Sequence, residues 1–267
     1  PRDGDLQVET VTGDSVTPGH MQALVSFSTG DLSVLQRFRL YPGCPAVGCD
    51  LFLGGQAAGN WRSEAVDASG LSQLENAKAA AEGKRSTTTL TRLDLTDPHL
   101  KARSVQFFDV TDRRNNLTNI DDFVPYNHPV ETLGNVLLLS DVLSERQLFI
   151  IKEAPCGDVQ LNCEGCNFRI SRQGVDVVGV GVSPEDIVQD AWLRCYGYAL
   201  GVATGGEFET LSALRAYQDH SRVHVAKRDN MIMLNTWGDR GQDTKLGEAF
   251  ALAELEAAAQ LGVTHFQ

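Results

Sequence analysis

A strand–loop–helix–strand pattern at the end of the chain constrains the fold more than any other feature of the sequence. Residues 231–234 form an all-apolar run, which is typical of a strand buried on both faces. Residues 244–261 are rich in strong helix formers and repeat apolar side chains at helical spacing, and Gly262 stands where a helix ends. A second strand begins at Val263. The pattern predicts a parallel βαβ unit, as at the start of a (β/α)8 TIM barrel or an open sheet.

The loop after the first of these strands holds the candidate site residues. In parallel α/β folds, the loops that follow the carboxyl ends of strands carry the chemistry. This loop contains Asn235, Trp237, Asp239 and Arg240. With the sugar substrate that the family resemblance given below implies, the indole would offer a flat partner to the apolar face of the sugar ring, and the charged side chains would bind its hydroxyls. The alternatives are that Trp237 packs in the core or loop, that Asp239 and Arg240 pair with each other, and that Asn235 only holds the loop.

Residues 6–202 follow the alternating pattern of β-strands instead. Apolar side chains alternate in residues 21–27 and 32–40 around a turn at 29–31, which predicts an antiparallel hairpin with one buried face. Further strands are predicted for residues 87–94, 104–110, 135–140, 147–152, 175–182 and 192–202. Many strands with few helical periods predict a mainly β fold built as a large antiparallel β-sandwich.

The period changes to the helical one near Gly205, where residues 208–220 predict a helix. We therefore expect a β-sandwich domain over residues 1–204, a linker helix over 205–228, and the first βαβ segment of a truncated barrel over 229–267.

Two stretches interrupt the strand pattern. Residues 70–83 predict a short surface helix, and the polar residues 112–130 predict a long loop. Asp121 and Asp122 fall in this loop, where solvated surface carboxylates are expected.

Charge and hydropathy exclude two classes of partner. A net charge of −12 argues against nucleic acid, whose binding depends on Lys and Arg, and against an anionic membrane surface. No apolar run approaches the length of about 20 residues that spans a membrane.

The six cysteines leave three options open: structural zinc, one or two disulfides, or unpaired thiols. Cys163 and Cys166 form a C-x-x-C with Cys156 seven residues before it, and Cys44 and Cys49 lie in a Pro/Gly loop. Structural zinc needs four ligands, and neither a second C-x-x-C nor a nearby His is present. No metal or organic cofactor is predicted.

The C-terminal motif resembles the start of the catalytic barrel in the α-galactosidase-like glycoside hydrolases, family 36 of clan D. Leu234-Asn235-Thr236-Trp237 is similar to a family strand that ends Asn-Ser-Trp. A helix ending Ala-Ala-Ala-Gln-Leu-Gly-Val and a strand His-Phe-Gln follow in the family's order, and an Asp-Asp-Gly-Trp segment comes next in the family. After Trp237, better-known members carry Glu where this chain has Gly238-Asp239-Arg240, which leaves the substrate preference open.

The resemblance continues upstream, where the family has an N-terminal β-sandwich. The matching segments are residues 35–43, which end Tyr-Pro-Gly, the paired strands 134–136 and 148–154, the segment 192–198 leading into 205–207, and the helix 208–220.

The resemblance implies the N-terminal part of a retaining glycoside hydrolase that releases terminal α-linked galactose from oligosaccharides. In the family, the nucleophile and the acid/base are Asp residues on later barrel strands, so no catalytic residue is assigned in residues 1–267, and the chain alone is expected to be inactive. The expected partners are an oligosaccharide or glycoside substrate and the remainder of the polypeptide, with a homo-oligomer as a further option. The alternative is a non-catalytic carbohydrate-binding or oligomerisation β-sandwich module.

Overall fold

The computed structural model describes residues 4–55, 87–95, 99–107, 118–153, 166–180, 187–195, 197–236, 244–245 and 247–267. The chain divides into two compact units, Pro1–Ser221 and Arg222–Gln267. Among the described helices, none is long and apolar enough to cross a membrane. The helix predicted for residues 70–83 lies outside the described residues.

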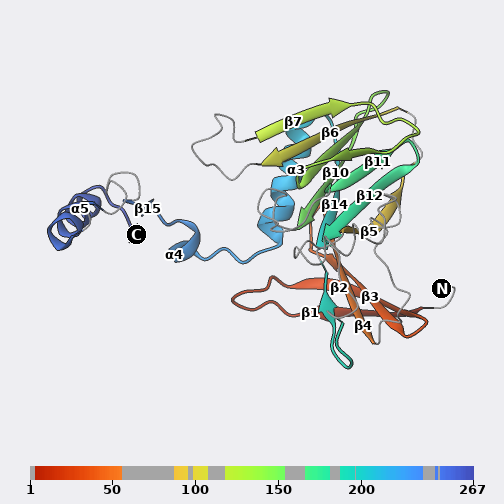
Figure 1. Ribbon diagram of the computed structural model, residues 1–267, viewed down its shortest axis with the longest axis horizontal. Helices are drawn as coiled ribbons and strands as arrows, with labels where there is room; N and C mark the ends of the chain where they lie inside the picture. Colours follow the sequence, from red (N-terminus) through yellow and green to blue (C-terminus); the bar gives the residue numbers. More distant parts are fainter. Residues whose placement is uncertain are drawn as a thin grey trace, which may run out of the picture. The chain divides into compact units, whose positions relative to one another are not determined.

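A ten-stranded antiparallel sheet forms most of the first unit (Figure 1). Its strands in spatial order are β1 (Asp5–Val11), β2 (His20–Thr29), β3 (Leu32–Leu40), β4 (Ala46–Gly55), β14 (Gly197–Thr204), β10 (Arg146–Glu153), β9 (Val136–Asp141), β6 (Leu100–Phe107) and β7 (Thr118–Phe123), with β13 (Leu193–Arg194) paired to β4.

A second antiparallel sheet packs on one face of the first. Its order is β5 (Thr87–Asp94), β12 (Gly174–Val180), β11 (Phe168–Ser171) and β8 (Val130–Thr132). One core cluster joins the two sheets, with Leu137, Leu139 and Ile150 from the large sheet against Phe168 and Val177 from the small one. The fold is therefore mainly β, with the sheet-on-sheet core of a sandwich, as the alternating pattern predicts.

Helix α3 (Glu207–His220) covers the opposite face of the large sheet. Successive residues of a strand point to opposite faces of the sheet. Leu138 and Phe149 therefore point away from the small sheet and pack with Tyr217 of α3 in a second core cluster. Gly206 is the N-cap residue before the helix, and its backbone N–H donates to Oε2 of Glu209 at 2.8 Å. The predicted helix over 208–220 is thus present, packed against β14, β10 and β4 of the first unit.

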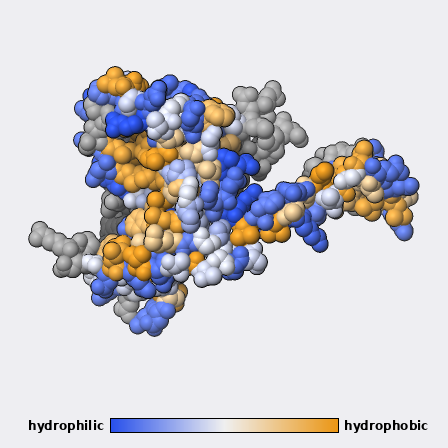
Figure 2. Space-filling model, turned by 180° about the vertical axis from the view of Figure 1, so that it is seen from behind, coloured by the Kyte–Doolittle hydropathy of each residue, from blue (hydrophilic) through white to orange (hydrophobic). Residues whose placement is uncertain are grey.

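The second unit contains α4 (Ala226–Asp229), β15 (Met233–Leu234), α5 (Glu248–Gln260) and β16 (His265–Phe266). Strands β15 and β16 pair in parallel, and α5 connects them. The expected burial of residues 231–234 is wrong, because Met231, Ile232 and Met233 are 42%, 58% and 53% exposed. The described part of this unit has one crossover helix, which can cover one face of the pair only. Orange apolar residues accordingly show on its surface (Figure 2).

The predicted loop over residues 112–130 is also wrong in part, because residues 118–123 form β7. Among the described strands, this one lies at the edge of the large sheet and pairs with β6. Most of its side chains are exposed, so its sequence lacks the apolar alternation that predicts a strand.

Candidate functional site

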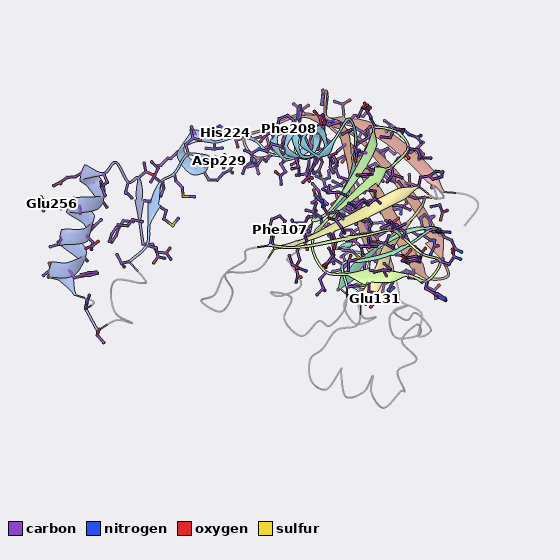
Figure 3. The ribbon with its side chains drawn as sticks, turned by 90° about the horizontal axis from the view of Figure 1, so that it is seen from above. Phe107, Glu131, Phe208, His224, Asp229 and Glu256 are labelled. Atoms are coloured by element: carbon purple, nitrogen blue, oxygen red, sulfur yellow. The ribbon has the colours of Figure 1, made fainter. Side chains whose placement is uncertain are left out.

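The carboxyl ends of β15 and β16 lie side by side in the second unit. Parallel pairing places Leu234 opposite Phe266, so Asn235 and Thr236 leave β15 at the edge where Gln267 leaves β16. The helix between the strands, on which Figure 3 marks Glu256, returns the chain to the amino end of the pair, where β16 begins parallel to β15. This edge is the position at which parallel α/β folds build their sites.

Hydrogen bonds fix the backbone at this edge. Gln267 donates its N–H to the carbonyl of Leu234 at 3.0 Å, and Thr236 donates its N–H to the carbonyl of Gln267 at 3.3 Å. The Thr236 side chain is buried, while Asn235 is exposed and places its amide nitrogen 3.5 Å from the side-chain oxygen of Gln267. The edge therefore presents two neutral amide side chains, which can each donate to and accept from a sugar hydroxyl.

The structure places one of the four predicted site residues, Asn235. The other three, Trp237, Asp239 and Arg240, lie outside the described residues. Gln267 was not predicted as a site residue, although the parallel pairing of the two predicted strands is the signal that would have placed it beside Asn235.

Asp122 is engaged in ion pairs on the large sheet. Arg103 donates to both of its carboxylate oxygens, at 2.8 and 3.0 Å, and the ammonium of Lys101 lies 3.7 Å away. These cations hold the pKa of Asp122 below its ordinary value, with Arg103 the largest cause. Arg103 also lies 2.8 Å from Glu207 at the start of α3. Asp122 is therefore kept ionised and paired with Arg103 and Lys101, which suits a structural role better than catalysis.

A buried charge network, which the sequence did not reveal, connects five elements of the first unit. Asp50 on β4 has a side chain with 0% exposure. Arg37 donates to its Oδ2 at 3.0 and 2.8 Å, and Arg194 on β13 donates to its Oδ1 at 2.7 Å. Arg39 lies 2.9 Å from Oδ2 through its Nε.

The network continues from Arg39 to α3. Arg39 donates to Oε2 of Glu153 on β10 at 2.8 Å, and Tyr217 of α3 donates its hydroxyl to the other oxygen of Glu153. Burial alone raises the pKa of Asp50, yet the three guanidinium groups outweigh it and hold that pKa below its ordinary value. Burial also raises the pKa of Tyr217 well above its usual range, and the Glu153 carboxylate adds to this effect. The network thus keeps Asp50 charged and the Tyr217 hydroxyl protonated.

The cysteines that the structure describes provide neither a disulfide nor a reactive thiol. Cys44, Cys49, Cys166 and Cys195 are free. Burial raises the pKa of the last three to about 11, so they stay protonated and unreactive at neutral pH. Within the described ranges, no group of three His, Cys, Asp or Glu side chains could hold a metal ion. Cys156 and Cys163 lie outside those ranges.

A hollow that the sequence did not reveal lies at the end of β4 in the first unit. It has a volume of about 450 Å³ and is lined by Asp31, Ser33, Gly54, Gly55 and the segment from Gln189 to Trp192. The only sign of this hollow in the sequence is Trp192, which directly precedes β13. A single Trp at such a position is more often a packing residue than part of a binding site.

The two units together, a β-sandwich followed by a parallel βαβ piece, define the class of fold, and solved structures show where it occurs. Neither a protein-family model nor a curated protein matches the sequence significantly. The α-galactosidase of Lactobacillus brevis aligns over 98% of this chain and 35% of its own, with a TM-score of 0.58 and 12% identity. The GH36 α-galactosidase AgaB of Geobacillus stearothermophilus aligns over 98% of this chain and 36% of its own, with a TM-score of 0.61 and 8% identity.

A variant of AgaA from Geobacillus stearothermophilus, solved in complex with raffinose, aligns over 99% of this chain and 37% of its own, with a TM-score of 0.58 and 8% identity. The chain spans about a third of the length of these structures. At such low identity the likeness shows the fold, which resembles that of the N-terminal domain of GH36 α-galactosidases.

Proposed function

We propose that this chain is the N-terminal part of a retaining glycoside hydrolase that releases terminal α-linked galactose from oligosaccharides. The single observation that carries the proposal is the extent of the structural likeness. Alignment with α-galactosidases covers 98% or more of the chain, so it includes the β-sandwich and the βαβ piece. A likeness confined to the sandwich would favour a binding module instead.

The βαβ piece supplies the first strands of the catalytic barrel in this proposal. Asn235 and Gln267 lie at the strand ends, where a barrel binds its substrate. Trp237, Asp239 and Arg240 follow in the same loop, so Trp237 would stack on a sugar ring and the charged pair would bind its hydroxyls.

The reaction requires two carboxyl groups about 5 Å apart, on either side of the scissile bond. One attacks the anomeric carbon and forms a covalent glycosyl-enzyme, while the other protonates the leaving oxygen and later takes a proton from water. Asp122, with Arg103 and Lys101 around it, does not meet this need. We assign both roles to Asp residues of the polypeptide beyond Gln267, on later strands of the barrel.

Hydrolysis of an aryl α-galactoside by the full-length protein tests the proposal. We expect turnover of this substrate, little turnover of the matching aryl β-galactoside, and none above background for residues 1–267 alone. Equal turnover of both anomers, or no turnover of either by folded full-length protein, would contradict the proposal. Turnover by residues 1–267 that is lost on mutating Asp121 and Asp122 would show that the active site is misplaced.

A further inference from the structure

The hollow at the end of β4 is built around one aromatic ring. Trp192 is 49% exposed and directly precedes β13, whose first residue, Leu193, pairs with Leu53 of β4. The six-membered ring of the indole lies next to Gly54, where an added Cβ would lie 3.1 Å from Cε3 of Trp192. A glycine at this position therefore lets the ring lie close to the strand, which holds the indole in place while leaving about half of it open to solvent.

Polar residues from two segments of the chain line the hollow together with Trp192. Asp31 and Ser33 come from the turn and the start of β3, and Gln189 and Asp190 come from the segment before β13. Asp190 has a φ of 66°, a left-handed conformation that Asp tolerates better than most residues. Both walls belong to the first unit, so the hollow does not depend on the placement of the second unit.

The size and chemistry of the hollow indicate a small polar ligand with one apolar face. Its volume of about 450 Å³ falls in the range of small-molecule sites, about 300–1,000 Å³. The lining residues include Asp31 and Asp190, whose carboxylates only accept hydrogen bonds, and Ser33, whose hydroxyl can also donate. An organic cation would use the indole and the carboxylates but not a donor, whereas a sugar ring uses all three kinds of group.

We propose that this hollow is a saccharide-binding site, in which a pyranose ring stacks on Trp192 and its hydroxyls bond to Asp31, Ser33 and Asp190. All residues that line the site belong to the first unit. That the ligand is a sugar is argued from the hollow itself, and that the sugar is of the galactose type rests on the proposed function.

The test uses the full-length protein labelled with 5-fluorotryptophan. The ¹⁹F resonance of Trp192 is identified by its loss in Trp192→Phe. Galactose and methyl β-D-galactoside, neither of which an α-galactosidase cleaves, are titrated to about 50 mM, well above a Kd of about 1 mM that would be typical of a weak site. We expect the Trp192 resonance to shift and saturate.

Two wall variants and one control sharpen the result. Asp190→Asn keeps a residue that tolerates the left-handed backbone and exchanges a charge-assisted hydrogen bond for a neutral one, so the Kd read from the Trp192 resonance should rise by about fivefold. Ser33→Ala should raise it by a smaller factor. Phe208→Ala removes another exposed aromatic of the same unit, which lies on α3 (Figure 3) and does not line the hollow, and should leave the Kd unchanged.

Three outcomes would overturn the inference. They are a Trp192 resonance that neither sugar moves, a Kd that the two wall variants leave unchanged, and a shift with tetramethylammonium chloride but not with sugars. Aryl α-galactoside hydrolysis is measured on the same samples. Hydrolysis without a Trp192 shift would contradict this inference alone, and a shift without hydrolysis would contradict the proposed function alone.

Discussion

The charge network around Asp50 illustrates what single residues contribute to this fold. Its partners are remote in sequence, since Arg37 lies 13 residues and Arg194 lies 144 residues from Asp50. Spacing along the chain could not reveal such a group, because only the pairing of β3, β4 and β13 brings it together. A buried carboxylate with three guanidinium partners is costly to disrupt, since Arg37 and Arg194 then lose this counter-charge and Arg39 keeps only Glu153.

Asp50→Asn should therefore destabilise the protein strongly. Replacing the carboxylate leaves three guanidinium groups around a neutral amide, and we expect the free energy of unfolding to fall by about 3 kcal/mol or more. Asp122→Asn is the matched control, because its ion pair with Arg103 is partly exposed and should contribute less than about 1 kcal/mol. Urea unfolding of the two variants measures the difference, and equal losses would contradict the structural role of Asp50.

The same carboxylate should make stability depend on acid pH. The folded pKa of Asp50 lies below its unfolded value of about 3.9, so its contribution is complete above that value and is lost as the pH falls through the folded pKa. We expect the free energy of unfolding to decline below about pH 4, and to decline less in Asp50→Asn. Urea unfolding over a pH series checks this, and parallel pH profiles for the two proteins would be the contrary result.

Trp237 is the residue on which the site prediction depends most, although it lies outside the described residues. If it stacks on the sugar, Trp237→Ala in the full-length protein should lower kcat/KM for an aryl α-galactoside by about tenfold or more. Steady-state kinetics measures this directly. A kcat/KM equal to that of the unaltered protein would reduce Trp237 to a packing residue.

At the scale of elements, the sequence predicts several strands that have one buried face but leaves out β4 and β11, although both have buried side chains. The run at residues 87–94 was predicted with the bounds that β5 has, and the hairpin of β2 and β3 follows from its alternating apolar side chains. The edge strand β7 was missed because its side chains are mostly solvated. The run 192–202 was predicted as one strand and is divided into β13 and β14, a break that alternation does not show.

The register between β10 and β14 gives a sharp test at this scale. Gly201 pairs with Phe149, whose ring is fully buried, and an added Cβ would lie 2.1 Å from Cζ of that ring. Because the backbone cannot move away without breaking the ladder, Gly201→Ala should lower the free energy of unfolding by about 1–3 kcal/mol. Thermal or urea unfolding measures it. Gly30→Ala is unsuitable as a control, because the positive φ of Gly30 would add backbone strain to the effect of the new side chain. Ala203→Gly makes the opposite substitution, from alanine to glycine, in the same strand.

At the scale of the whole molecule, the order of elements was predictable and the candidate site was only partly so. The change from strand to helix spacing near Gly205 is local, so the sequence shows it, and α3 follows. The domain limits proposed from it remain a prediction, although α3 packs on the sandwich. The neighbourhood of Asn235 and Gln267 follows from the parallel pair that the sequence predicts. The neighbourhood of Trp192 and Asp31 depends on strand pairing between distant segments, which sequence periodicity does not specify.

The central claim is that the full-length protein is a retaining α-galactosidase, and ¹H NMR of the first galactose released from raffinose tests it most directly. A double displacement returns the anomeric carbon to its original configuration, so α-galactose should appear first and convert to the β-anomer only by slow mutarotation. Initial release of β-galactose would contradict the retaining mechanism. Intact raffinose after prolonged incubation with folded full-length protein would contradict the claim itself.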